Sequence, residues 1–180
     1  MAWYIDWVKN NTLLSAFIQF FIFGTLGEVV GIMVAKRKLS NNALEWLLKA
    51  LVWGVLGILV KYAFKGFSGF VDNLVHSDFL PGIFGPDRGS NVLILRAFAL
   101  SLFMNAQFGP LLMFLHRTTD NLITKSRGYS GIDKSLKTLA WFWLPAHTVT
   151  FSLPTDYQIG AAALLSVALG VIMGFTKRKA

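Results

Sequence analysis

The polar side chains best placed for chemistry interrupt one long apolar stretch, residues 91–116 (NVLILRAFALSLFMNAQFGPLLMFLH). Inside it lie Arg96, Asn105, Gln107 and Pro110. A polar group in hydrocarbon costs free energy unless it finds water or a partner, so such a membrane helix must face a bundle or a cavity. Asn and Gln side chains can also join helices by hydrogen bonds alone, and this second interpretation stays open for both amides.

A second polar stripe runs along residues 43–76. Positions three and four apart share one face of a helix. On this face lie Gly54, Gly57, Lys61, Lys65, Ser68, Asp72 and His76. A single lysine would carry its charge to the membrane surface by snorkelling. Two lysines one turn apart that continue a glycine stripe favour one wall of a hydrated cavity.

A third group lies in residues 13–35, where Gly24, Gly27 and Gly31 share one helical face with Glu28. Small residues let another backbone come close, so this face and Glu28 are expected to contact protein. Glu28 is then either a buried, hydrogen-bonded acid within a packing groove or a functional acid. Residues predicted to pack helices together are Gly24, Gly27, Gly31, Gly54, Gly57, Gly170 and Gly174.

These residues predict a path for a solute and no catalytic site. Several polar side chains fall near mid-span, and the cations lie nearer one surface, an arrangement that suits small polar or anionic solutes. The predicted pathway residues are Glu28, Lys61, Lys65, Arg96, Asn105, Gln107 and His147. No metal-ligand spacing and no nucleotide-binding or nucleophile motif is present, so we expect no enzyme activity, metal or cofactor. The segment 116–120 (HRTTD) is expected to cap and anchor a helix end.

The composition indicates that transmembrane helices carry these side chains. Of 180 residues, 54% are hydrophobic and only 14% charged, and the mean hydropathy is +0.55. We therefore predict an all-α integral membrane protein with a single domain, residues 1–180, built as a bundle of about five transmembrane helices. The expected spans are 13–35, 43–76, 91–116, 134–153 and 157–175. The second is too long to cross perpendicularly, so it tilts, breaks near residues 66–69 or projects from the bilayer.

The basic residues predict the orientation. The formal charge is +8, and eleven of the 17 basic residues fall after the first span, after the third span or at the C-terminus. They are Lys36, Arg37, Lys38, Arg117, Lys125, Arg127, Lys134, Lys137, Lys177, Arg178 and Lys179. This bias predicts that the N-terminus lies outside and the C-terminus in the cytoplasm. We expect the membrane to be a prokaryotic cytoplasmic membrane. Anionic lipid headgroups explain the charge better than nucleic acid does. The expected partners are the lipid bilayer, a small-molecule solute and further copies of the chain, and we expect no cleavable signal or transit peptide.

Several short motifs, in order along the chain, resemble the Mpv-seventeen (peroxisomal membrane protein) family. They are Gly27-Glu28; Gly54, Gly57, Phe67, Phe70, Val71, Asp72, Pro81 and Gly82; Asn105, Gln107, Phe108 and Pro110; and Trp143, Pro145, Phe151 and Pro154. The family's Gly-Pro and Trp-Tyr pairs in the second helix are absent, as is the arginine after the last proline. The family is usually drawn with four membrane helices, against the five expected here. The resemblance implies a membrane channel, or a protein that supports metabolite balance across a membrane.

Two functions of different class follow. The first is a channel or transporter that passes small polar, anionic solutes. The second is a structural or assembly protein of the membrane whose polar stripes are only helix–helix interfaces. Water at the stripe of Lys61 and Lys65 would distinguish them.

Overall fold

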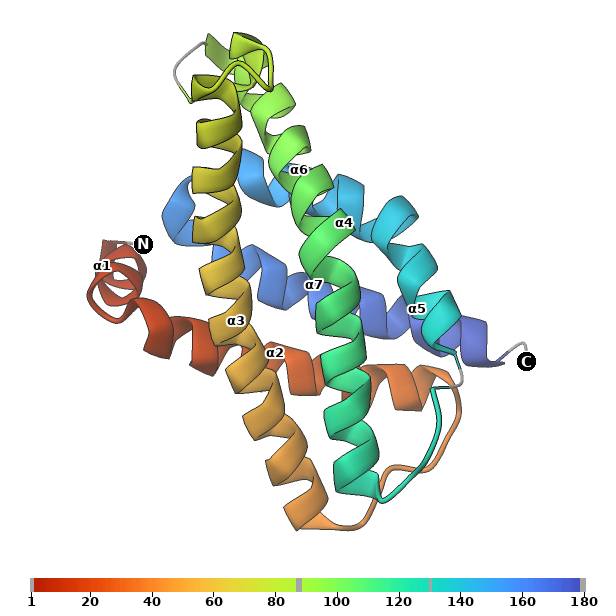
Figure 1. Cartoon of the computed structure of the whole chain (residues 1–180). Coiled ribbons are helices and arrows are strands. Elements are labelled where there is room, and N and C mark those ends of the chain that lie inside the picture. Colours follow the sequence, from red (N-terminus) through yellow and green to blue (C-terminus); the bar gives the residue numbers. More distant parts are fainter. Residues whose placement is uncertain (1, 87–88, 130, 179–180) are drawn as a thin grey trace. The chain divides into compact units, whose positions relative to one another are not determined.

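The computed structural model describes residues 2–86, 89–129 and 131–178. Within these ranges all regular secondary structure is helical, which confirms the all-α class (Figure 1). The elements are α1 (Ala2–Asn10), α2 (Thr12–Val34), α3 (Ala43–His76), η1 (Gly82–Phe84), α4 (Gly89–Thr124), α5 (Ile132–Thr138), η2 (Leu139–Trp143), α6 (Leu144–Ser152) and α7 (Thr155–Arg178).

Four helices in the described ranges are long and apolar enough to cross a bilayer. They correspond to Thr12–Val34, Ala43–His76, Leu93–Thr124 and Thr155–Phe175. The remaining predicted span, 134–153, is helical but interrupted. It consists of α5, the π-helical turn η2 and α6, one directly after another. Pro145 explains the interruption because it has no amide hydrogen to donate to the carbonyl four residues earlier.

Two long helices test the expectations. α3 is one unbroken helix of 34 residues, about 51 Å long. Of the three alternatives for this span, the break near residues 66–69 is therefore excluded, and tilting or projection remains. α4 extends to Thr124, well past the predicted end at His116. The segment 116–120 therefore lies inside a helix, and the prediction that it caps a helix end is wrong. The physical reason is that no glycine or proline follows Pro110 until Gly128, whose φ is +117°.

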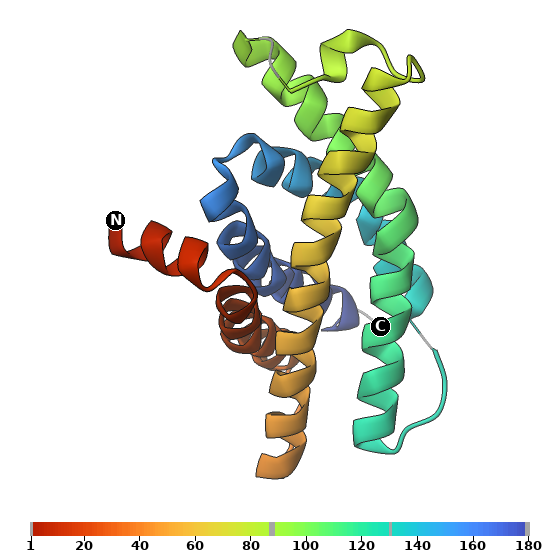
Figure 2. The same cartoon turned by 60° about the vertical axis from the view of Figure 1, so that its left-hand side comes forward.

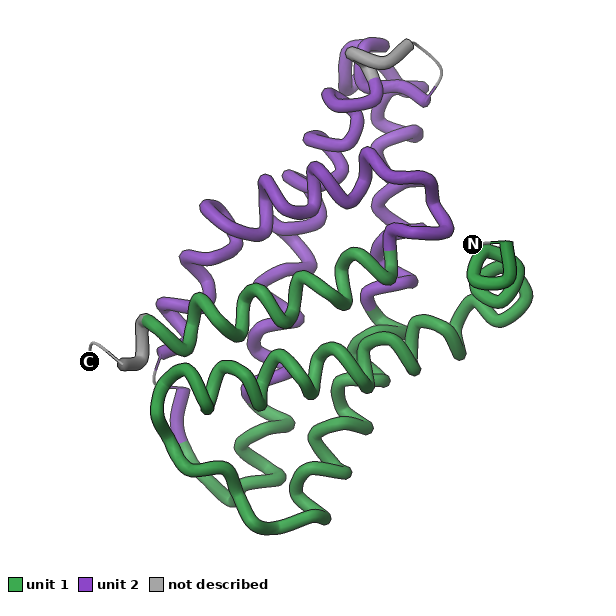
Figure 3. Tube along the Cα trace, turned by 180° about the vertical axis from the view of Figure 1, so that it is seen from behind, with its two compact units in different colours: residues 1–59, 118–127, 159–180 green, residues 60–117, 128–158 purple. Residues whose placement is uncertain are grey.

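The chain divides into two compact units (Figure 3). Unit 1 contains residues 1–59, 118–127 and 159–180, and unit 2 contains residues 60–117 and 128–158. One boundary falls inside each of α3, α4 and α7, so these three helices contribute to both units.

In unit 1, α2 and α7 lie side by side and run in the same direction (Figures 1 and 3). Their backbones touch at glycines. A Cβ built on Gly27 would overlap the carbonyl of Ser166, and one built on Gly31 would lie 3.0 Å from the carbonyl oxygen of Gly170. Farther along, a Cβ on Gly174 would lie 2.7 Å from the carbonyl oxygen of Gly31. Later residues of α2 thus meet later residues of α7, which defines a parallel pair with small residues at every fourth position.

The first part of α3 packs on α2 in the opposite direction. A Cβ on Gly54 would meet the ring of Phe17, and one on Gly57 would lie 2.6 Å from the carbonyl oxygen of Ala16. Earlier in α3, the indole of Trp53 covers Gly24, the closest approach to a built Cβ being 2.5 Å. Later residues of α3 therefore meet earlier residues of α2, and the two helices are antiparallel.

Unit 2 is built from the end of α3, the start of α4 and the segment 128–158. The two α3 and α4 portions run side by side in both views (Figures 1 and 2), and Phe70 meets Phe103 edge-on at 5.3 Å between ring centroids. Against them, Leu139 covers Gly109, and the Ser101 hydroxyl donates to the carbonyl oxygen of Leu144 at 2.7 Å. The segment 132–152 thus runs antiparallel to α4.

The glycine contacts predict an opposite response to the same substitution at two places. Gly170→Ala should lower the stability of the folded protein by about 1–3 kcal/mol, since its Cβ would overlap the carbonyl of Gly27. Gly66→Ala should be neutral or stabilising by up to about 1 kcal/mol, because nothing lies within 4 Å and alanine favours the helix. Unfolding in detergent micelles measures both, and equal effects of the two substitutions would contradict the described packing.

Candidate functional site

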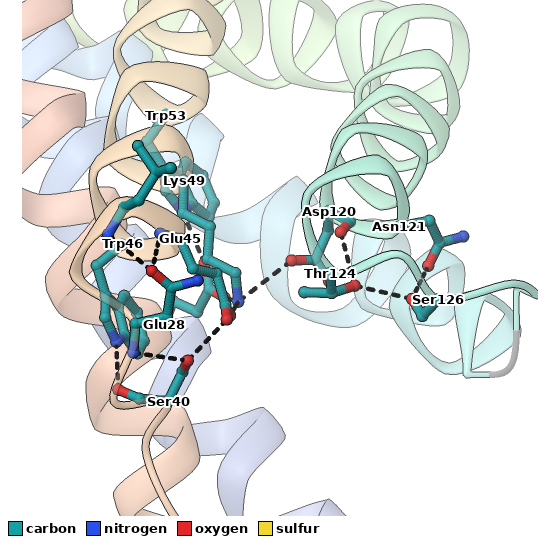
Figure 4. Close-up of polar contacts among 12 residues, drawn as sticks. Glu28, Ser40, Glu45, Trp46, Lys49, Trp53, Asp120, Asn121, Thr124 and Ser126 are labelled. Carbon is teal, nitrogen blue, oxygen red and sulfur yellow. Dashed lines mark hydrogen bonds and ion pairs between the residues drawn. The ribbon is translucent and has the colours of Figure 1, made fainter.

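A polar cluster lies in unit 1 around Lys49 of α3 (Figure 4). Its ammonium lies 2.7 Å from Glu28 Oε1 of α2, and 3.3 Å from both Glu45 Oε1 and Asp120 Oδ1. The lysine side chain is only 9% exposed. One buried cation is therefore the common counter-charge of three carboxylates from α2, α3 and α4, and we call this group the Lys49 cluster.

Neighbouring side chains hold the Lys49 cluster in place. The indole Nε1–H of Trp53 donates to Glu28 Oε2 at 3.2 Å, and the Ser40 hydroxyl donates to Glu45 Oε2 at 2.7 Å. The ammonium also lies 5.1 Å from the ring centroid of Trp46, within range of a cation–π interaction. Because Glu45 and Lys49 are four residues apart on one helix, their pairing follows from α3 itself.

The first turn of α3 is fixed by local capping. The Asn42 side-chain oxygen accepts from the amides of Leu44 and Glu45, at 3.0 and 3.4 Å. An asparagine in this position satisfies amides that have no helical partner. The cap orients the turn that carries Glu45 and so supports the Lys49 cluster.

A second ion pair lies in unit 2. The guanidinium of Arg96 donates to Asp72 Oδ1 and, at 3.0 Å, to the hydroxyl of Ser68. Asp72 and Ser68 lie one turn apart on α3, on the stripe identified in the sequence. The carboxylate of Asp72 thus neutralises the charge of Arg96, so Arg96 offers no unpaired positive charge to a solute.

The third polar group, also in unit 2, joins two residues of the predicted pathway. His147 Nδ1 lies 3.3 Å from the side-chain oxygen of Asn105. The Asn105 amide donates to the carbonyl oxygen and hydroxyl of Ser101, at 2.8 and 3.1 Å. Both Asn105 and His147 are buried, with 6% and 8% of their surface exposed. They form a hydrogen-bonded pair between α4 and α6 through His147 Nδ1.

Lys61, Lys65 and Gln107 stand apart from these groups. Lys61 is half-buried and within electrostatic range of Asp156, whereas Lys65 and Gln107 are exposed. Among the described residues, neither lysine has a carboxylate within salt-bridge distance.

The structure thus places the predicted pathway residues in separate groups. Glu28 belongs to unit 1 and the other six to unit 2, where Asn105 and His147 meet directly. The sequence reasoning overlooked Lys49 and Asp120. A signal existed for Lys49, since it is the one basic residue between Ala43 and Val60 and it follows Glu45 by four positions. Asp120 lies beyond the predicted end of the third span, and only the extended α4 brings it to Lys49.

The described residues contain no group of three or more histidine or acidic side chains arranged to hold a metal ion. The chain matches no protein-family model, no curated protein and no solved structure. What the fold and composition define is a class: an all-helical protein whose long apolar helices suit a membrane. The Mpv-seventeen resemblance stays a proposal based on its short motifs.

The Lys49 cluster predicts a large energetic effect for one substitution. Lys49→Met should destabilise unit 1 by about 3–5 kcal/mol, because it leaves three carboxylates without their shared counter-charge. Combining it with Glu28→Gln should cost less than the sum of the two single changes. Denaturant unfolding of the four proteins measures this coupling. Lys38→Met, at an exposed position, is the matched control, and additive effects at Lys49 and Glu28 would contradict the pairing.

Proposed function

We propose that the protein crosses a membrane five times and passes small polar, anionic solutes. The N-terminus lies outside and the C-terminus in the cytoplasm, as the distribution of basic residues suggests. The proposed membrane is the cytoplasmic membrane of a prokaryotic cell. Membership of the Mpv-seventeen family and assembly with further copies of the chain belong to the same proposal.

The packing directions support five crossings. Because α2 and α7 are parallel, a chain in which both cross must traverse the membrane an odd number of times between them. α3 and α4 supply two traversals, so a third is required, and the segment 132–152 is the part of the chain that remains. Its antiparallel packing on α4 agrees with that role. The interruption by η2 and Pro145 does not prevent a crossing, because neighbouring helices can satisfy freed backbone groups.

Cysteine labelling tests the number of crossings in this cysteine-free chain. Single cysteines at Ser77, Ser126 and Thr155, all exposed, should react with an impermeant reagent from the outside, the inside and the outside, respectively. The decisive pair is Ser126 and Thr155, which flank the segment 132–152. If both were labelled from one side, this segment would not cross and the five-span proposal would fail.

The observation that carries solute passage is the contrast between paired and unpaired cations. Lys49 and Arg96 each have carboxylate partners, whereas Lys61 and Lys65 have none at salt-bridge distance among the described residues. A lysine placed centrally in a membrane helix costs about 2.5–3.5 kcal/mol on insertion scales, so two unpaired ones favour contact with water or an anion. A hydrated passage along this face of α3 would bring both water and anions to Lys61 and Lys65.

Solute flux tests this part of the proposal. Purified protein in liposomes should pass small anions, and Lys61→Gln with Lys65→Gln should reduce the flux about tenfold or more, because the local potential that attracts anions is lost. The double change Lys38→Gln with Lys134→Gln removes equal charge at exposed positions and should leave the flux unchanged. Empty liposomes provide the background. Equal loss in both double variants would argue against a specific role of Lys61 and Lys65.

A structural or assembly role is the alternative, and a specific observation favours it. The Lys49 cluster, the pair of Arg96 with Asp72 and the glycine contacts of α2 and α7 all use polar or small residues to join helices. If wild-type protein passes no solute under any gradient, these contacts are interfaces only and the structural role stands.

A further inference from the structure

The hydrogen bonds around Asn105 have a single consistent direction. The Ser101 hydroxyl donates its only proton to the carbonyl oxygen of Leu144 at 2.7 Å. Its oxygen therefore accepts at 3.1 Å from the Asn105 amide nitrogen, which also donates to the Ser101 carbonyl at 2.8 Å. Both amide protons point toward Ser101, so the side-chain oxygen of Asn105 is the atom that faces His147.

This direction assigns the tautomer of His147. An amide oxygen can only accept, so the Nδ1 atom 3.3 Å away must carry the proton. In the neutral imidazole the other nitrogen, Nε2, then holds a lone pair. Nε2 makes no hydrogen bond to any residue that the structure describes. Unit 2 thus contains an unused acceptor on a side chain that is only 8% exposed.

A complementary unused donor lies on the neighbouring ring. The Nε1–H of Trp143 is buried and has no hydrogen-bond partner in the described part of the chain. The Trp143 ring stacks on His147, with centroids 4.9 Å apart and an interplanar angle of 30°. A buried donor without a partner costs about 1–3 kcal/mol of stability. Such donors are rare in folded proteins, and each one calls for an explanation such as a bound molecule. Trp143 ends the π-helical turn η2, a type of irregularity that often occurs at functional sites.

Apolar rings lie against His147. Phe64 meets His147 edge-on at 5.9 Å between centroids, and Phe151 lies 6.2 Å from His147 and 4.7 Å from Phe64. An apolar surrounding with one donor and one acceptor is typical of a site for a small polar molecule.

We propose that Trp143 Nε1–H and His147 Nε2 together bind the hydroxyl group of one small neutral molecule, either water or a small alcohol. A hydroxyl accepts one hydrogen bond and donates another, which matches the two free atoms. A carboxylate offers nothing to donate to Nε2, and an ammonium group has no lone pair for the indole. The site goes beyond solute passage, since a bound hydroxyl would be present whether or not the protein transports.

Nuclear magnetic resonance of ¹⁵N-labelled protein in lipid nanodiscs tests the site. The Trp143 indole and His147 ring signals are assigned by their loss in Trp143→Phe and His147→Gln. We expect one protonated and one lone-pair nitrogen on His147, and nuclear Overhauser cross-peaks from the Trp143 indole proton to water. Trp143→Phe keeps the stacked ring but removes the donor, so it should shift the Nε2 signal of His147. Trp141→Phe, at a side chain that is 55% exposed, is the matched control and should leave Nε2 unchanged.

Adding glycerol distinguishes the two sources of the hydroxyl. Cross-peaks from the indole proton to the carbon-bound protons of glycerol would identify small alcohols as ligands, and cross-peaks to water alone would identify a bound water. Three results would overturn the proposal: protonation of His147 at Nε2, no cross-peak to either molecule, or scalar coupling that reveals a direct hydrogen bond from Trp143 to His147. These readouts are independent of flux, so loss of transport and loss of the site are separable.

Discussion

The backbone contact between α2 and α7 is the constraint on which unit 1 depends. Gly27 and Gly31 present bare backbone to Ser166, Gly170 and Gly174, and this closeness is attainable only without side chains. Lipid tails are as apolar as leucine, so close van der Waals packing, and not hydrophobic burial, must stabilise such a pair in a bilayer. The contact also makes the two helices parallel, which in turn determines how often the intervening chain has to traverse a membrane.

Local patterns predicted much of the helical structure. Apolar runs located α2, α3 and α7 to within a few residues, because apolar length and flanking polar turns are local properties. Ser101, Asn105 and Gly109 are four residues apart and so share one helical face, and all three contact the segment 132–152. The C-terminal end of α4 and the interruption at η2 were not predicted. Both depend on the balance between helix continuation and tertiary contacts, which periodicity does not measure.

Ion pairs between helices were harder to predict from the sequence than the helices themselves, because they depend on which helices become neighbours. Glu28 and Lys49 are 21 positions apart, and Arg96 and Asp72 are 24 apart. Spacing along one helix placed Ser68 and Asp72 on one face but could not name the arginine that binds them. The same limit explains why Lys49 was overlooked. Residue depth alone does not show which side chains of the predicted pathway meet, and the structure shows a direct contact between Asn105 and His147.

The glycine contacts have a consequence for how this sequence can vary. Glycine is the smallest residue, and every amino acid that replaces it adds at least a Cβ atom. At Gly27 and Gly170 that atom would overlap a backbone carbonyl, which cannot move aside as the tip of a flexible side chain can. Gly66 and Gly69, with nothing within 4 Å, carry no such restriction. Substitution is therefore restricted at Gly27 and Gly170, whereas packing places no restriction on substitution at Gly66 and Gly69.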